Sequence, residues 1–457
     1  MQPCNVARVI IDILPDVALL NIFDFYVNQD GEDIEAWYTL VHVCRNWRNV
    51  VFGSPRRLKL QLRCTDNTPV KKTLDVWPLL PIIVSGYGYE EWGADNIIAI
   101  LEHNDRIRQL RLFDIPTSQM ERVLGAMQKS FLALNDLQLQ SRGVTVPVVP
   151  ASFLGDSAPQ LQILHLYSIP FPGLPKLLLS CTHLVELYLR KIPHSGYFSP
   201  AVMATGLSAL TRLDDLVIEF ESPRCRPDWK TRHLTPQTRT LLPALTKFCF
   251  VGADEYLDDL VAQIIAPLLD NLSITFFYQL MFSTPQLAEF ISRTPKFKEY
   301  DEALVEFSDW RVWVTTTDRA FSLAISCRKS DYQLSSLAQI CSSVFIPAVE
   351  HLYIFEEKYR PLLWPDDIDS AEWLEFLHPL TAVKNLRISR EFVPRIAPTL
   401  QVLAGGRVTE VLPALQTLFL EIPRASGPVQ ESIEKFVAAR QLSGHPIAVS
   451  FWEGTPF

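Results

Sequence analysis

One spacing of apolar residues recurs along most of the chain. Each instance has an apolar residue, two intervening positions, and then two apolar residues separated by one position, as in "IRQLRL" from Ile107 and "LQILHL" from Leu161. The alternation at its end is that of a strand with one buried face. The middle apolar residues of the units are Leu110, Leu137, Leu164, Leu187, Leu216, Phe248, Leu272, Leu352, Leu386 and Leu418. The first seven follow one another at intervals of 23 to 32 residues, so the pattern is a sequence repeat.

Segments of helical periodicity separate these strands. In "SQMERVLGAMQKSFLAL" from Ser118 and "EYLDDLVAQIIAPLL" from Glu255, apolar residues recur three and four positions apart. A strand and a helix every ~27 residues cannot bury their apolar faces alone, so neighbouring units must stack. We therefore expect an α/β repeat solenoid with parallel strands and the helices outside.

These units resemble degenerate leucine-rich repeats. Three of them end alike, in "LRLFDIP", "LHLYSIP" and "LYLRKIP", but Ile115, Ile169 and Ile192 stand where the usual repeat has Asn or Cys. Residues 285–345 are predicted to be irregular, although 303–317 and 319–327 read as strands that would fill two places in the array. An irregular α/β fold whose strands share a pattern is the alternative.

Composition limits the class of protein. The chain has 457 residues, 48% of them hydrophobic and 20% charged, which indicates a globular protein of about three domains unless repeats form one long domain. The net charge of −9 argues against a general nucleic-acid partner. The eight cysteines include no CxxC pair, which favours reduced thiols in an intracellular protein of the cytoplasm or nucleus. Residues 271–288 are too polar to cross a membrane, and we expect no membrane partner.

The segment "ILPDVALLNIF", residues 13–23, is unusually apolar. Pro15 suits the start of a helix, and Asp16 places a negative charge in its first turn. At ~100° per residue, the polar residues Asn21, Asp24 and Asn28 fall in one narrow sector, and apolar residues cover more than half of the circumference. The helix predicted from residue 40 has only one apolar stripe. The first helix therefore needs two partner surfaces, and the second needs one.

"LPDVALLNIF" from Leu14, followed by "VCRNW" from Val43, resembles the F-box. With degenerate leucine-rich repeats behind it, the chain is similar to the expanded F-box families of mushroom-forming fungi. The resemblance implies a three-helix F-box domain at residues 1–58 and a repeat solenoid at 59–457. The connection "NQDGEDIEAW" from Asn28 is longer than usual.

The F-box resemblance implies an adaptor that binds the Skp subunit of a Skp-cullin-F-box ubiquitin ligase while the repeats recruit a protein substrate. The residues predicted to contact the Skp-type adaptor are Leu14, Pro15, Val17, Leu20, Ile22, Phe23, Val43 and Trp47. We favour contact for Leu14, Pro15 and Leu20, whereas Val43 and Trp47 are as well explained as residues that hold the helices together. The alternative function is a non-ligase repeat protein whose first helices only cap the solenoid.

No pattern of residues indicates chemistry. The glycines of "VSGYGYEEWG" from Val84 do not form a nucleotide loop, and the acidic residues at 366, 367, 369 and 372 lack the spacing of a calcium loop. We therefore predict no enzyme activity, no cofactor and no metal site. Residues 222–239 are predicted to form a basic loop in an acidic chain, which would suit an acidic or phosphorylated substrate segment. Its candidate residues are Arg224, Arg226, Lys230 and Arg232, and Arg239 follows. The alternative, which we favour, is a solvated, mobile loop.

Overall fold

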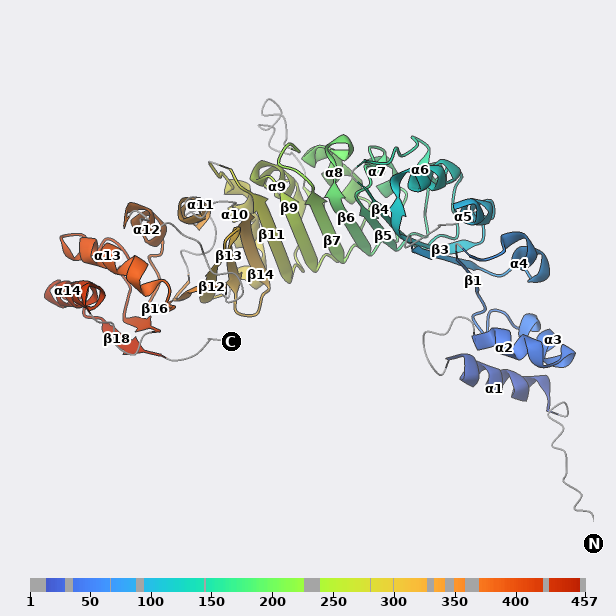
Figure 1. Cartoon of the computed structure of the whole chain (residues 1–457), viewed down its shortest axis with the longest axis horizontal. Helices are drawn as coiled ribbons and strands as arrows, with labels where there is room; N and C mark the ends of the chain where they lie inside the picture. The colour runs from blue at the N-terminus through green and yellow to red at the C-terminus, as the bar shows by residue number, and fades with distance from the viewer. Residues whose placement is uncertain are drawn as a thin grey trace, which may run out of the picture. The chain divides into compact units, whose positions relative to one another are not determined.

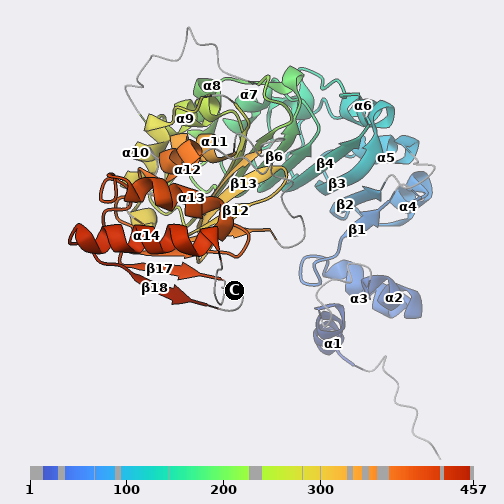
Figure 2. The ribbon, with the colours of Figure 1, turned by 60° about the vertical axis from the view of Figure 1, so that its left-hand side comes forward.

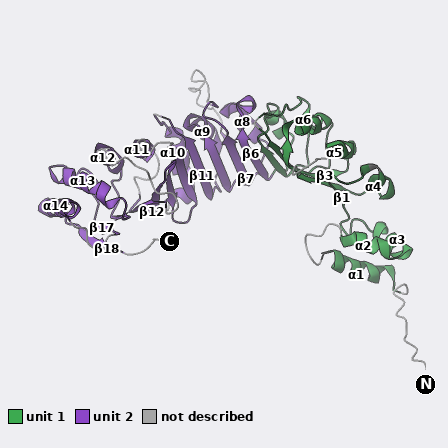
Figure 3. Ribbon diagram, in the orientation of Figure 1, with its two compact units in different colours: residues 1–184 green, residues 185–457 purple. Residues whose placement is uncertain are grey.

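The computed structural model divides into two compact units, Met1–Leu184 and Val185–Phe457 (Figure 3). The structure describes residues 14–28, 36–65, 67–87, 94–143, 145–225, 239–279, 281–298, 300–326, 333–341, 349–357, 370–421 and 427–452. The predicted division at residue 58 stays a prediction.

Unit 1 begins with three helices and continues as alternating strands and helices (Figure 1). The three helices are α1 (Asp16–Asn28), α2 (Ala36–Val43) and α3 (Arg45–Gly53). The remaining elements are β1 (Leu62–Cys64), α4 (Val70–Val76), β2 (Ile82–Tyr87), α5 (Ala94–Leu101), β3 (Ile107–Pro116), α6 (Thr117–Ala126), β4 (Asp136–Arg142), the 3₁₀ helix η2 (Phe153–Asp156), β5 (Ile163–Tyr167) and α7 (Leu174–Leu178). The strands pair in parallel, in chain order from β1 to β5.

Unit 2 continues the alternation. Its first part comprises β6 (Glu186–Ile192), η3 (His194–Gly196), α8 (Pro200–Leu207), β7 (Asp215–Phe220), β8 (Thr240–Leu241), β9 (Lys247–Gly252), α9 (Asp254–Val261), β10 (Ile264–Ile265), β11 (Asn271–Phe277), α10 (Pro285–Arg293) and η4 (Pro295–Lys298). The second part comprises β12 (Glu302–Phe307), β13 (Arg311–Thr316), β14 (Phe321–Ser326), α11 (Gln333–Cys341), β15 (His351–Glu356), α12 (Ser370–Leu377), β16 (Asn385–Ile388), α13 (Val393–Ala404), β17 (Thr417–Leu420), α14 (Pro428–Leu442) and β18 (Ala448–Phe451). Within this unit the strands of the main sheet lie in the order β6-β7-β9-β11-β14-β13-β12-β15-β16-β17-β18.

The repeated apolar spacing coincides with the strands. Every one of the ten middle residues lies on a strand of the main sheet and is fully buried. They stand in register: Leu110 is opposite Leu137 and Leu137 opposite Leu164, and in unit 2 Leu352 pairs with Leu386 and Leu386 with Leu418. The prediction of an α/β repeat with parallel strands is therefore confirmed for most of the sheet.

The shared Ile-Pro ending has a structural reason. The residue before each isoleucine has a left-handed backbone, with φ of 55° at Asp114, 56° at Ser168 and 47° at Lys191. Pairing shifts register at this point in β3 and β6, as in a bulge. The turn directs Ile115, Ile169 and Ile192 inward, where they are buried. An apolar side chain thus fills the place that Asn or Cys has in regular repeats.

The expectation of parallel strands throughout is wrong in the section predicted to be irregular. Residues 302–326 form three strands where we expected two, and β13 pairs antiparallel with both β12 and β14. The outer two strands rejoin the parallel array, β14 beside β11 and β12 beside β15. The cause is the length of the connections: Ser308–Trp310 and Thr317–Ala320 are long enough for hairpins, whereas a parallel return needs a crossover of about a dozen residues.

Candidate protein-interaction surface on the opening helices

The inner face of α1 packs against the two following helices. Leu19, Leu20 and Phe23 are buried, and the ring of Phe23 lies 4.7 Å from that of Trp47 on α3. The buried residues that α2 and α3 contribute are Trp37, Leu40, Val41, Val50 and Val51. Most of the apolar stripe predicted for residues 40–51 is therefore covered inside the three-helix group, but Val43 is exposed. The single helix predicted there is wrong, because Cys44 divides it into α2 and α3.

Local chemistry sets where these helices start. The carbonyl of Pro15 accepts the first hydrogen bonds of α1, from the amides of Ala18 at 2.8 Å and Leu19 at 3.1 Å, so the helix begins directly after the proline. Cys44 separates α2 from α3 and caps α3, since its sulfur accepts the Trp47 amide at 3.4 Å. The Val-Cys-Arg-Asn-Trp sequence thus forms a helix boundary as well as a packing surface.

The outer face of α1 stays open. The exposed apolar residues on or beside it are Leu14 (38%), Val17 (64%), Ile22 (47%), Phe25 (68%) and Tyr26 (44%). At ~100° per residue, they span about half of the helix circumference, on the side away from Leu19, Leu20 and Phe23. We call these five residues the α1 outer face.

An aromatic cluster fixes the other side of the three helices. The ring of Trp77, after α4, lies 5.4 Å from Trp37, 5.2 Å from Tyr38 and 5.9 Å from Phe52. The Trp37 indole also donates to the carbonyl of Gln61 at 3.1 Å. Within unit 1, therefore, α2 and α3 make the contacts to the first repeats, and these contacts leave the α1 outer face uncovered by any described residue.

The predicted adaptor-contact residues divide into two groups. Leu14, Pro15, Val17, Ile22 and Val43 are exposed. Leu20 and Phe23 lie inside the helix group and Trp47 is half-buried against Phe23, so these three are placed to hold the helices together. Leu20, for which we favoured contact, is interior, and Val43, for which both interpretations were open, is 54% exposed. Which of these residues contact an adaptor stays a prediction.

Two residues of the open face were missing from the prediction. Phe25 and Tyr26 lie one turn beyond Ile22 and are as exposed as the residues that we named. Their apolar character was visible in the sequence, but the F-box motif ends at Phe23. The helical rotation, extended beyond the motif, is the signal that would have found them.

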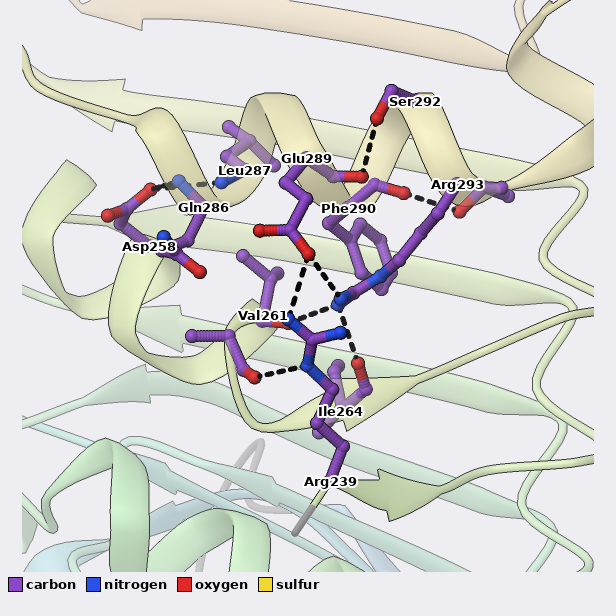
Figure 4. A network of polar contacts seen from close by, with 12 residues as sticks. Arg239, Asp258, Val261, Ile264, Gln286, Leu287, Glu289, Phe290, Ser292 and Arg293 are labelled. Carbon is purple, nitrogen blue, oxygen red and sulfur yellow. Dashed lines mark hydrogen bonds and ion pairs between the residues drawn. The ribbon is translucent and has the colours of Figure 1, made fainter. Parts of the chain in front are cut away.

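Only part of the basic segment 222–239 belongs to the described residues. Arg224 is exposed, and Arg226, Lys230 and Arg232 lie outside the described residues. Arg239 is bound within unit 2 (Figure 4): its guanidinium donates to the Glu289 carboxylate at 2.8 Å and to the carbonyl of Ala262 at 3.1 Å. Arg293 shares the same carboxylate at 3.3 Å. Arg239 is therefore already paired within unit 2, although its side chain is 36% exposed.

The described residues hold no cluster of His, Cys, Asp or Glu that would bind a metal ion. Of the acidic group near residue 366, only Glu372 belongs to the described chain. Burial raises the pKa of the thiols of Cys64, Cys181 and Cys225 to about 11, which keeps them protonated at neutral pH. None of the described helices has the length and apolarity needed to cross a bilayer.

No family model and no curated protein matches the chain. Among solved structures, a similar one is the crystal structure of the leucine-rich repeat-containing protein LegL7 from Legionella pneumophila, with 13% sequence identity and a TM-score of 0.28. The match covers 68% of this chain and 93% of that chain.

Proposed function

We propose that this chain is the substrate receptor of a Skp-cullin-F-box type ubiquitin ligase. The first three helices act as an F-box that binds a Skp-type adaptor, and the leucine-rich-repeat-like array that follows captures a protein substrate. The observation that carries the proposal is the α1 outer face, because it is apolar on a helix whose opposite face is already packed.

Exposed apolar residues are ordinary when they are scattered, but here they adjoin one another on a single helix. Val17, Ile22 and Phe25 project from successive turns, and polar Asn21 lies among them, held by the guanidinium of Arg57. An apolar helix face of this kind is what a partner groove receives. The sequences "LPDVALLNIF" and "VCRNW" around this face resemble the F-box, and this resemblance suggests a Skp-type adaptor as the partner.

The proposed role requires no chemistry from the chain itself. A receptor holds its substrate near a ubiquitin-carrying enzyme, so it works through proximity and needs neither a cofactor nor a nucleophile.

Co-expression with a Skp-type adaptor, followed by co-purification, tests the proposal. We expect the full chain to retain the adaptor, and Val17→Asp and Ile22→Asp to lose it, because each places an unpaired carboxylate in the contact. Val76→Asp is the matched control, since Val76 is 72% exposed but lies on α4, outside the opening helices. Leu20→Asp is unsuitable because Leu20 is interior, and its variant would fail by unfolding.

The proposal fails if the wild-type chain does not retain the adaptor, or if both α1 variants retain as much as the control. The second candidate is then favoured: a non-ligase interaction protein whose helices cap the repeats. The aromatic cluster around Trp77 supports it, because that cluster attaches the helices to the array. Against it, a cap presents polar residues to water, and α1 presents Val17 and Phe25.

A further inference from the structure

The strand β18 leaves its core-facing side chains uncovered. It pairs with β17 so that Val449 stands opposite Leu418 and Phe451 opposite Leu420. Leu418 and Leu420 are 0% and 2% exposed, as at the same positions of β15 and β16. Phe451 is 47% exposed and Val449 half-buried. These two side chains therefore occupy positions that are buried in the neighbouring strands, but no described residue covers them.

The backbone of β18 is also unpaired along one side. The amides of Ala448 and Trp452 donate to β17, to the carbonyls of Gln416 at 2.8 Å and Leu420 at 3.1 Å. Because successive amides of a strand point in opposite directions, those of Val449 and Phe451 point away from β17. No residue of the described chain accepts from them, and β18 is the last strand of the sheet order.

The helix α14 lies beside β17 and β18 (Figure 2). Side chains of α14 and β18 line a groove along this edge. Its volume is about 320 Å³. Ile433, Val437 and Ala438 of α14 form one wall, and Val449 and Phe451 form the floor. Apolar side chains and unsatisfied strand backbone thus meet in one place.

We propose that this edge binds an extended segment of a partner protein, which adds to the sheet as a further β-strand beside β18. The segment alternates apolar and polar residues, with the apolar side chains entering the groove under α14. The backbone argues for a strand, because the outward amides and carbonyls at Val449 and Phe451 are satisfied in ladder geometry only by another strand. The inference does not depend on the adaptor role of α1.

The open backbone of β18 favours a strand over a docked helix as the occupant. A helix satisfies its own backbone groups, so it would seal the apolar floor and leave the amides of Val449 and Phe451 buried without acceptors, which is unfavourable. Gln430, Glu434 and Gln441 on the rim give the polar residues of an added strand hydrogen-bonding partners.

The probe for the test is a pooled set of short synthetic peptides with Val, Leu, Ile or Phe at alternate positions and Thr, Lys or Glu between them. Binding to the full chain is measured by fluorescence anisotropy. Val449→Pro removes an outward amide without touching the bonds to β17, and Phe451→Glu places a charge on the groove floor. Ala448→Lys is the matched control, since Ala448 is exposed on the opposite face of the same strand.

We expect members of the pool to bind, the first two variants to weaken binding at least about tenfold, and Ala448→Lys to leave it unchanged. The amides of Val449 and Phe451 should exchange hydrogen more slowly in the complex. A peptide N-methylated at alternate residues keeps its side chains but should not bind. If Val449→Pro disturbs the terminal repeat, the N-methylated peptide still tests whether binding needs backbone hydrogen bonds.

Three results would overturn the proposal. In the first, no member of the pool binds. In the second, binding is indifferent to both Val449→Pro and N-methylation, which would mean that the groove takes a ligand other than a strand. In the third, the free chain sediments as a dimer that Val449→Pro dissociates, which would make a second copy the occupant of the edge.

Discussion

Arg440 offers a sharp test of how the last repeat is held together. It lies on α14 and is fully buried, and no carboxylate of the described chain pairs with it. Instead its guanidinium donates to four carbonyls: Val408 at 3.0 Å, Leu415 at 2.9 Å, and Leu412 and Pro413 at 3.4 Å. Leu412 has a left-handed backbone with φ of 51°, so the arginine also clamps a strained turn. Burial lowers the pKa of Arg440, but the group stays charged.

The change Arg440→Met keeps the volume of the side chain and removes its donors. Each carbonyl left buried without a partner costs about 1–3 kcal/mol. If only the two short bonds count, the free energy of unfolding of the terminal repeat should fall by about 2–6 kcal/mol. The free energy of unfolding of Arg440→Lys should lie between those of the wild type and Arg440→Met, because an ammonium group lacks the planar guanidinium geometry that reaches several carbonyls.

Hydrogen exchange of the α14 amides, measured at increasing urea, gives the local free energy of opening. Lys435→Met is the matched control: Lys435 lies on the same helix, but its ion pair with Glu431 is exposed and should contribute less than about 1 kcal/mol. Equal protection of α14 in Arg440→Met and Lys435→Met would refute the reasoning.

Three further predictions concern the interior. Burial raises the pKa of Asp254 to about 7, from 3.8 in the unfolded chain, so the folded state binds more protons in this window and stability falls as pH rises from about 4 to about 7. Urea denaturation of Asp254→Asn should show a flatter pH dependence than wild type; an unchanged slope would contradict the assignment. Gly252→Ala should destabilise by about 1–3 kcal/mol in the same assay, since a Cβ would lie 2.6 Å from Phe250 Cζ; no loss would show that the ring moves freely. Trp37→Ala should cost about 3–5 kcal/mol and expose the opening helices to limited proteolysis, whereas wild-type resistance would mean that the aromatic cluster contributes little.

The sequence predicts the strands of the repeat well because their signal is local. A strand with one buried face must place Leu137 or Leu386 inward, and the same spacing recurs wherever a unit stacks on the next. The hairpins of 302–326 escaped prediction for the opposite reason. Alternation identifies a strand, but it does not give the direction in which that strand pairs with its neighbour.

The candidate site was predicted in part. The rotation of α1 indicates that two apolar faces exist, but it does not say which face the neighbouring helices cover. Leu20 and Val17 are equally apolar in sequence, and only the packing of Phe23 on Trp47 decides that Leu20 is inside. The open edge of β18 carries no sequence signal, since Val449 and Phe451 read as core residues, and what exposes them is the absence of a neighbouring strand among the described residues.

We propose that the α1 outer face binds another protein, and the affinity of a Phe25 variant for a Skp-type adaptor tests this most directly. Phe25 is 68% exposed, so sealing it in a complex is worth about 2 kcal/mol. In calorimetric titration with a purified Skp-type adaptor, Phe25→Ala should weaken binding about 30-fold while the free energy of unfolding of the free chain stays within about 0.5 kcal/mol. An adaptor that binds Phe25→Ala as tightly as the wild-type chain, or that binds neither, would contradict the account.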